Sequence, residues 1–437
     1  MKLLLLLALV SFVFAEEKDL SFFVNKALEN NLELKAERNK VKSYEYEYMS
    51  ARGMLFPTLK ISETFTRTDV PGYVLFGKLN QERITQNDFI PDKLNNPNSL
   101  NNFETNLSLQ IPIWMGGKLQ AYKNMAKYRW EAESFNYQRK EEEVILKVYE
   151  AYANAVLAKE YVRVAQQAVR EAEEHLKLAK KAYEVGTALF ADVLRARVHH
   201  AKALENLERA KNDYQVAKKA LELLINEELG DFDVKDFEGC KEVDKEQVMK
   251  VALENREDYR ATYYFAKSVE EGMKSAYADA LPHIYAFASY LMYDKNTPFG
   301  SHGDGYMVGV GVSWEFNLGF SPIYKARSFK EQKLSVLHQR EFLGKAIFFE
   351  IEKAYKSYEN ALYSLKSAQE RVKQAEEVVR VLQKRYQNGL ARMVDLLDAQ
   401  TQLDMARLDY VKALRDCNVA RAQVLFAGGI LKEEVAK

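Results

Sequence analysis

The chain has 437 residues, and its 63 basic and 63 acidic side chains cancel at neutral pH. This balance argues against a protein that holds nucleic acid or another polyanion by bulk charge. The length would ordinarily indicate two or three globular domains, but the pattern along the chain indicates a different organisation.

The N-terminal residues are typical of a cleaved secretory signal. They carry one cation at Lys2, an apolar run over residues 3–14 and the small residue Ala15. The run is too short to cross a bilayer as a helix, so we predict a signal peptide at residues 1–15 and an exported protein. No later segment supplies the continuous apolar stretch of about 18 residues that a transmembrane helix needs.

The positions of proline predict where long helices can form. No proline lies in residues 113–281 or after residue 322, and both tracts are rich in Ala, Leu, Lys, Glu and Gln. Proline interrupts helices and these other residues favour them, so each tract can hold long helices. The helix predicted from Lys118 to Val185 would be about 100 Å long, far beyond an ordinary globular helix.

Both tracts share one pattern of apolar residues, spaced three and four apart and repeated at an offset of 203 residues. Four unbroken heptads per copy indicate coiled-coil packing, and the many alanines indicate closely approaching helices. The two copies are Val193, Ala196, His200, Ala203, Leu207, Ala210, Tyr214, Ala217 and Leu221, and Leu396, Ala399, Leu403, Ala406, Tyr410, Ala413, Cys417, Ala420 and Val424. Gly186 and Gly389 stand where a left-handed cap would end one helix before its antiparallel partner begins.

The duplication extends beyond these hairpins. The stretch ALEN occurs at residues 27–30 and 252–255, and Pro57 and Pro282 keep the same offset. Internal duplication is typical of a quasi-symmetric architecture. We predict a first structural repeat at 16–228, an acidic linker at 229–245, a second repeat at 246–427 and a C-terminal tail at 428–437.

Between the helices the pattern changes to a period of two. Residues 103–114 and 306–316 alternate apolar with polar or small side chains, and residues 58–67 and 283–293 are weaker partners, with Glu63 breaking the alternation. This pattern is typical of outer-membrane barrel strands, with lipid outside and water inside; strands of a soluble sandwich are the alternative. We expect strand hairpins at about 58–114 and 283–317, with helix–barrel junctions at Pro57, Trp114, Pro282 and Trp314.

Four strands are too few to close a barrel. Open strand edges are not tolerated in lipid, and known barrels start at about eight strands. At least two chains must therefore pool their strands, and the number of chains stays open at this point.

The chain resembles the TolC-type outer-membrane efflux proteins, or outer membrane factors, over essentially its full mature length. The duplicated turns YEVGTALFADVL and YQNGLARMVDLLDAQ, the paired ALEN stretches and the two strand hairpins carry the resemblance. It implies a mainly α fold with a small β part. In this fold a homotrimer forms an α-barrel from duplicated coiled-coil hairpins and one shared twelve-stranded transmembrane β-barrel, to which each chain gives four strands.

The resemblance also implies a function. The chain would be the channel-tunnel of a tripartite efflux or type I secretion system, a passive duct across the periplasm and outer membrane of a Gram-negative-type envelope. Its partners would be outer-membrane lipid, a periplasmic adaptor protein and an inner-membrane transporter. The sequence does not identify the cargo, nor does it show whether the resting tunnel is open or closed.

Site residues follow from matching the motifs at the turns, which would form the inner end of the tunnel. Asp395 and Asp398 match acidic positions at the pore entrance, while Asp192 and Tyr386 match positions whose hydrogen bonds hold the closed state. Arg392 is the candidate for an arginine of the same latch, displaced by one position. The tip turns that would dock the adaptor contain Gly186, Thr187, Gly389 and Leu390.

Plain structural roles are the alternative at these turns. Acidic residues near a helix N-terminus complement the helix dipole, and Arg392 with Asp395 could be an ordinary i,i+3 ion pair.

Other chemistry is sparse in the sequence. Cys240 and Cys417 give no pattern of a disulfide framework or a four-ligand metal site, and whether they are free stays open. The histidines lack metal-ligand spacing, and GDGYMVGVG lacks the strand–turn–helix setting of a phosphate loop. We therefore expect no enzyme activity, no cofactor and no nucleic-acid partner.

A second functional hypothesis is a structural tether or adhesin of the cell envelope, built from the same helices without an open bore. The duplicated strand hairpins and the acidic turns favour the channel, because a tether needs neither a polar inner face nor quasi-symmetry.

Overall fold

The computed structural model describes residues 16–435, so the predicted signal peptide lies outside the described residues. The chain divides into two compact units. The helical unit holds residues 16–40, 134–261 and 340–435 of the described part, and the strand unit holds residues 41–133 and 262–339. Within residues 16–435, no helix has an apolar stretch long enough to cross a membrane.

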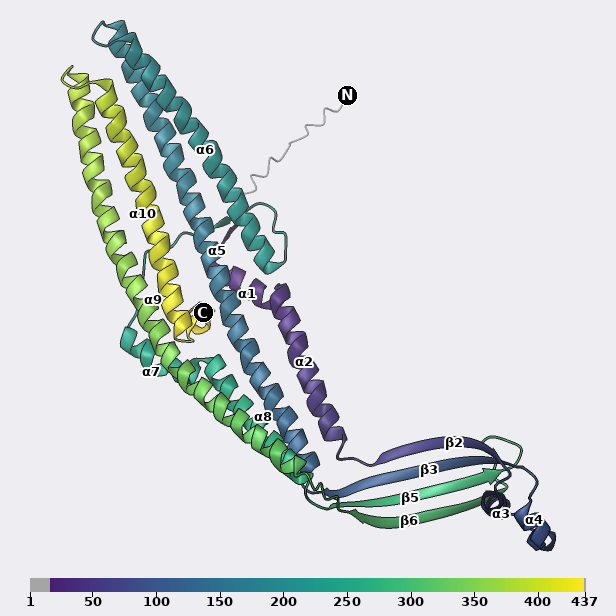
Figure 1. The fold of residues 1–437 in the computed structure, drawn as a ribbon. Helices are drawn as coiled ribbons and strands as arrows, with labels where there is room; N and C mark the ends of the chain where they lie inside the picture. Colours follow the sequence, from purple (N-terminus) through teal and green to yellow (C-terminus); the bar gives the residue numbers. More distant parts are fainter. Residues whose placement is uncertain (1–15, 436–437) are drawn as a thin grey trace, which may run out of the picture. The chain divides into compact units, whose positions relative to one another are not determined.

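Two long antiparallel hairpins supply most of the helical unit (Figure 1). The first pairs α5 with α6 and the second pairs α9 with α10. Both long helices have 67 residues, and their partners have 36 and 35. The bounds are Lys118–Glu184 for α5, Phe190–Ile225 for α6, Ser321–Gln387 for α9 and Met393–Ala427 for α10. The predicted long helices and their duplication are confirmed.

The two hairpins pack together near their turns through the predicted apolar seam. One buried cluster contains Val193 and Ala196 of α6 together with Leu396 and Leu403 of α10, all of them seam positions. Ala179 of the first hairpin and Val379, Tyr386, Met393 and Leu397 of the second complete the cluster. The heptad pattern thus correctly located the surface by which the hairpins meet.

A larger core lies around the N-terminal helix. α1 (Leu20–Asn30) buries Phe23 and Val24 against residues of α5, α6 and β4. The C-terminal helix α11 (Leu431–Val435) adds Leu431 to the same core. The segment predicted as a C-terminal tail therefore contains a short packed helix.

Strand pairing and contacts with a buried lysine hold the linker predicted at 229–245 in place. Its strand β4 (Phe232–Val234) pairs in parallel with β1 (Glu16–Lys18). The buried Lys159 of α5 donates from Nζ to the carbonyl of Val234 at 2.5 Å, and its Nζ lies 3.2 Å from the Asp233 carboxylate.

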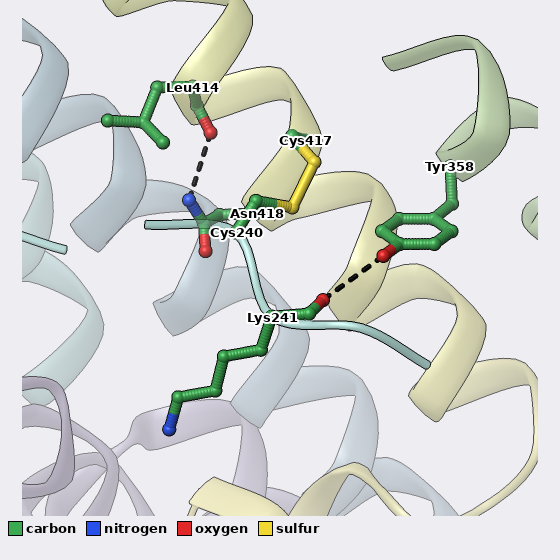
Figure 2. Close-up of a disulfide and its surroundings, with 6 residues drawn as sticks. All are labelled: Cys240, Lys241, Tyr358, Leu414, Cys417 and Asn418. Atoms are coloured by element: carbon green, nitrogen blue, oxygen red, sulfur yellow. Dashed lines mark hydrogen bonds between the residues drawn. A yellow bond between two sulfur atoms is a disulfide. The ribbon is translucent and has the colours of Figure 1, made fainter. Parts of the chain in front are cut away.

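A disulfide bond also fixes the linker, joining Cys240 to Cys417 of α10 (Figure 2). Beside it, the Tyr358 hydroxyl of α9 donates to the carbonyl of Lys241 at 3.1 Å. The prediction of no disulfide framework misses this bond, because the fold brings together two cysteines that are 177 residues apart. Sequence spacing alone does not reveal such a pair.

Short helices meet the ends of α6 and α10 through equivalent contacts. α1 and α2 (Leu32–Gly53) join at Asn31, whose Nδ2 donates to the carbonyl of Leu224 at 2.8 Å. α7 (Lys245–Asn255) and α8 (Glu257–Ala278) join at Arg256, whose Nη1 donates to the carbonyl of Ala427 at 3.0 Å. Both carbonyls belong to the last turn of a helix, where no partner exists within the helix. An asparagine in one repeat and an arginine in the other therefore supply the hydrogen bond that each helix end lacks.

The strand unit holds a four-stranded antiparallel sheet in the order β2-β3-β5-β6 (Figure 1). The strands are β2 (Thr58–Thr68), β3 (Leu100–Met115), β5 (His283–Asp294) and β6 (Gly303–Ser313). β6 ends at Ser313, whereas the alternating pattern extends to Phe316. Just after the strand, the indole Nε1 of Trp314 donates to the carbonyl of Ala280 at 3.1 Å. The connection from β2 to β3 contains three helices that the sequence pattern does not predict: α3 (Pro71–Asn80), the 3-10 helix η1 (Gln86–Phe89) and α4 (Pro91–Asn95).

The register of the sheet confirms one apolar and one polar face. Ile61, Leu107, Tyr290 and Tyr306 are paired in register and share the apolar face, where Val308, Val310 and Val312 are also exposed. Glu63, which breaks the alternation of β2, accepts a hydrogen bond from its register partner Thr105.

On the polar face, two aromatic rings of β5 lie across glycines of β6. A Cβ on Gly309 would come within 2.7 Å of the Phe287 ring, and one on Gly311 within 2.5 Å of the Tyr285 ring. Glycine is needed at these two positions because the rings occupy the space where a side chain would begin.

Candidate functional site

The two predicted tip turns have the same backbone structure. Gly186 and Gly389 have φ values of 77° and 72°, the left-handed conformation expected of a helix cap. The next residue in each turn donates back to the helix: Thr187 N–H to Ala182 O at 2.9 Å, and Leu390 N–H to Arg385 O at 2.8 Å. The prediction of two equivalent turns is therefore correct at the level of individual hydrogen bonds.

A cavity of about 720 Å³ lies between the two turns of the helical unit. It brings together most of the predicted tip residues, which line it as Gly186, Thr187, Asp192, Tyr386, Gly389 and Arg392. Leu390, Asp395 and Asp398 lie outside the lining. The structure thus groups the predicted latch residues around one cavity, and Asp395 is joined to this lining by its ion pair with Arg392.

The side chains of the two turns differ where their backbones agree. Tyr386 is 9% exposed and belongs to the buried seam cluster, whereas Tyr183, the equivalent residue of the first turn, is 47% exposed and contacts the ring of Phe190. Within the described residues the Tyr386 hydroxyl has no hydrogen-bond partner. Burial, with a smaller contribution from the nearby Asp192 carboxylate, raises the pKa of Tyr386.

Asp192 caps its own helix rather than bonding to Tyr386. Its Oδ2 accepts from the backbone N–H of Leu189 at 3.2 Å, which satisfies one of the free donors at the start of α6. Among the described residues no hydrogen bond joins Asp192 to the Tyr386 hydroxyl.

Arg392 and Asp395 form the i,i+3 pair that was the plain alternative. Arg392 Nη2 lies 2.9 Å from Asp395 Oδ1, and Arg392 Nε lies 3.2 Å from Oδ2. The arginine side chain, by hydrogen bonding, lowers the pKa of the Asp395 carboxyl. Asp398 is exposed one turn further along α10. Both carboxylates are therefore available to solvent near the turn.

The four predicted junction residues lie in the strand unit, where helices and strands meet. Pro57 and Pro282 directly precede β2 and β5, and Trp114 follows a register shift near the end of β3. Trp314 directly follows β6, and its ring packs against Phe316 with ring centroids 4.6 Å apart.

A buried polar layer between the hairpins was not predicted. Gln400 of α10 is 1% exposed, and its Nε2 donates to Glu171 Oε2 of α5 at 2.5 Å and to Asp404 Oδ1 at 3.0 Å. Arg407 Nη1 contacts both carboxylate oxygens of Glu171, at 3.0 and 2.9 Å. His175 Nε2 lies 3.3 Å from Gln400 Oε1. The only signal in the sequence is that these polar residues stand directly beside seam positions such as Ala399 and Leu403.

Asp404 is the perturbed group of this layer. Burial, helped by the Glu171 charge, raises its pKa to about 6 against the opposing effects of Gln400 and Arg407. Asp404 and His199 also line a cavity of about 450 Å³ between α5, α6 and α10. No group of three or more His, Cys, Asp or Glu side chains in residues 16–435 is placed to hold a metal ion.

Comparison with known proteins gives consistent matches along the chain. A family model described as outer membrane efflux protein matches residues 23–227 and 248–429. The alkaline protease secretion protein AprF of Pseudomonas aeruginosa is 22% identical over 363 residues, covering 80% of this chain and 73% of AprF. The outer membrane protein TolC of Escherichia coli strain K12 is 22% identical over 364 residues, covering 77% of this chain and 72% of TolC.

Solved structures give the same fold. A structure of CusC matches with a TM-score of 0.79 at 14% identity, covering 95% of this chain and 93% of CusC. The open state of the Neisseria gonorrhoeae channel MtrE matches with a TM-score of 0.74 at 19% identity, covering 94% of this chain and 89% of MtrE. The predicted fold class is confirmed.

Proposed function

The chain belongs to the outer membrane efflux protein family, and on that premise we propose that three copies of it assemble into one channel. The protein is an outer-membrane channel-tunnel of an efflux or type I secretion system, and its helical part extends into the periplasm. The observation that carries the assembly is the open sheet: β2 and β6 are edge strands, and an open edge is not tolerated in lipid. Three sheets of four strands would close as one twelve-stranded barrel.

Four strands per copy support closure between copies. β6 of one copy would pair with β2 of the next, so that the apolar face of each sheet turns toward lipid and the polar face toward water. The halves at 16–228 and 246–427 would act as two structural repeats, giving six similar hairpins around one axis. The equal 67-residue lengths of α5 and α9 support this quasi-symmetry.

The tip residues would act at the inner end of this assembly. Asp395 and Asp398 of three copies would place six carboxylates around the entrance, favouring cations. Asp192, Tyr386 and Arg392 would hold the closed state. The Tyr386 hydroxyl has no hydrogen-bond partner in residues 16–435, which supports a hydrogen bond that forms only in the trimer. The turns with Gly186, Thr187, Gly389 and Leu390 would dock a periplasmic adaptor, which connects the channel to an inner-membrane transporter.

The family is one of transport channels, and we propose that the chain catalyses no reaction. Pro57, Trp114, Pro282 and Trp314 would mark the level at which helices give way to membrane strands. Tryptophan suits that level because its ring is apolar and its N–H polar.

Recording single channels from the purified full-length protein in planar lipid bilayers tests this function. We expect stepwise currents with cation selectivity, and replacing both Asp395 and Asp398 by alanine should move the reversal potential toward zero in a salt gradient. A protein that enters bilayers without carrying current would instead support the tether hypothesis. An unaltered reversal potential in the double variant would exclude the acidic ring while leaving the channel in place.

A further inference from the structure

Helix α3 lies at the end of the sheet where β2 leads to β3 (Figure 1). Its Gly77 packs on Leu100, which is 4% exposed, and its last carbonyl, Asn80 O, would lie 2.1 Å from a Cβ on Gly303. Leu100 alternates with Asn106 and Gln110 on β3, and Gly303 pairs with Tyr293, so both residues point to the polar face. In a closed barrel this is the inner, water-filled side.

The connection that carries α3 is anchored. The side chain of Gln81 is fully buried, and its Nε2 donates to the carbonyl of Asn101 at 2.9 Å and to Asn102 Oδ1 at 2.8 Å. Lys78 Nζ lies 2.7 Å from Asp88 Oδ1, and the Lys78 hydrogen bond is the main reason why the pKa of Asp88 falls to about 2. These contacts hold α3 in place over the sheet.

The free face of α3 is apolar. Tyr73, Phe76 and Leu79 are 72%, 63% and 51% exposed, and they lie opposite Val74, which is 2% exposed. The only charged side chain of α3, Lys78, is turned to its ion pair with Asp88. A helix with apolar residues on both faces is typical of a buried helix, so the exposed face needs a partner.

The size of the proposed barrel identifies that partner. Twelve strands about 4.8 Å apart and tilted by about 40° close into a barrel of roughly 12 Å radius. A helix with its side chains is about 10 Å across, so three helices side by side need a circle of roughly 11 Å radius. Three copies of α3, each bound to the inner face of its own strands, have no room to remain apart.

We propose that the α3 helices of three copies meet on the axis at the outer mouth of the barrel and form an apolar constriction from Tyr73, Phe76 and Leu79. The occupant of each free α3 face is therefore a second copy of this chain, and the constriction is a second narrow point, separate from the tip turns. This inference rests on the proposed trimer. Cargo leaving the channel would have to pass between these side chains, which favours compounds with apolar surface.

Disulfide cross-linking tests the contact between copies. Helices that touch at the axis place inward Cα atoms about 4 Å from it, and the copies of such an atom are roughly 7 Å apart, the limit for a disulfide. The native cysteines are bonded to each other, so Tyr73→Cys, Phe76→Cys and Leu79→Cys each add one free thiol. Mild oxidation of purified trimers should give disulfide-linked dimers in at least one of these variants, seen by non-reducing electrophoresis.

Val308→Cys is the matched control, because Val308 is equally exposed but lies on the apolar face of β6. Copies of an outward residue in the proposed barrel are roughly 20 Å apart and should not cross-link. A bulky charged thiol reagent should lower the single-channel current of Phe76→Cys and leave that of Val308→Cys unchanged. Trimers in which none of the three α3 thiols cross-links, or a Phe76→Cys current that the reagent does not change, would overturn the constriction. Absence of trimers would instead contradict the proposed function.

Discussion

Asp404 shows how a single buried carboxyl makes the seam between the hairpins sensitive to pH. Its folded-state pKa of about 6 lies above its ordinary value of 3.8 because it is buried beside Glu171. Between these two values the folded chain binds more protons than the unfolded chain, so this group lowers stability as the pH rises through that window. Above pH 6 the full penalty applies, and below pH 3.8 there is none.

Asp404→Asn should therefore stabilise the protein at neutral and alkaline pH. The asparagine keeps an oxygen for Gln400 and removes the buried charge, so we expect a gain of up to about 3 kcal/mol at pH 8 and a smaller one at pH 4.5. Thermal melting at the two pH values measures the difference. Asp409→Asn is the control. Asp409 also lies on α10, but it is exposed and forms an ion pair with Arg371 of α9, so its variant should show no such pH dependence. Equal shifts for Asp404→Asn at both pH values would contradict the prediction.

At the scale of elements, strand β6 depends on the two glycines beneath the aromatic rings of β5. Gly311→Val should destabilise the sheet, because its Cβ would lie 2.5 Å from the Tyr285 ring, which must then move. Overpacking of this kind costs about 1–3 kcal/mol.

Gly305→Val provides a matched control on the same strand and the same polar face. Nothing lies within 4 Å of a Cβ placed there, and valine favours strands. Melting of the purified protein should show a lower midpoint for Gly311→Val only. If both variants melt alike, the rings do not fix the requirement for glycine.

The long helices were predictable because their signals are long-range and redundant. Proline-free tracts, heptads and the cap glycines Gly186 and Gly389 all agreed, and the predicted helix from Lys118 ends within one residue of its observed end at Glu184. Helix α3 was missed for the opposite reason. It has 10 residues, begins with Pro71 and has little polar face, so no amphipathic period marks it.

The candidate site was predictable only in part. The backbone of the turns follows from local sequence, since a left-handed cap calls for glycine. The pairing of side chains does not: Asp192 bonds to its own helix, and Arg392 takes the neighbouring Asp395. The polar layer around Gln400 and the bond between Cys240 and Cys417 depend on which segments pack together in the fold. The local sequence does not contain that information.

For the whole molecule, Tyr386 offers the most direct test of whether the closed state depends on contacts between copies. The buried hydroxyl has no partner among the described residues, so Tyr386→Phe should leave the fold of one chain intact. If the hydroxyl bonds only in the closed trimer, the variant should leak, and single-channel recordings should show a higher conductance. Tyr183→Phe, the equivalent change in the exposed residue of the first turn, should have no effect. Unchanged conductance in Tyr386→Phe would remove this residue from the latch.

The disulfide has a consequence for the order in which the protein matures. Cys240 leaves the cytoplasm long before Cys417, since 177 positions separate them, and such bonds form in oxidising compartments. The covalent bond between the central linker and α10 therefore cannot form until nearly the whole polypeptide has been exported. A chain that stops before α10 can never form it, so closure of this one bond reports that export has reached the final long helix.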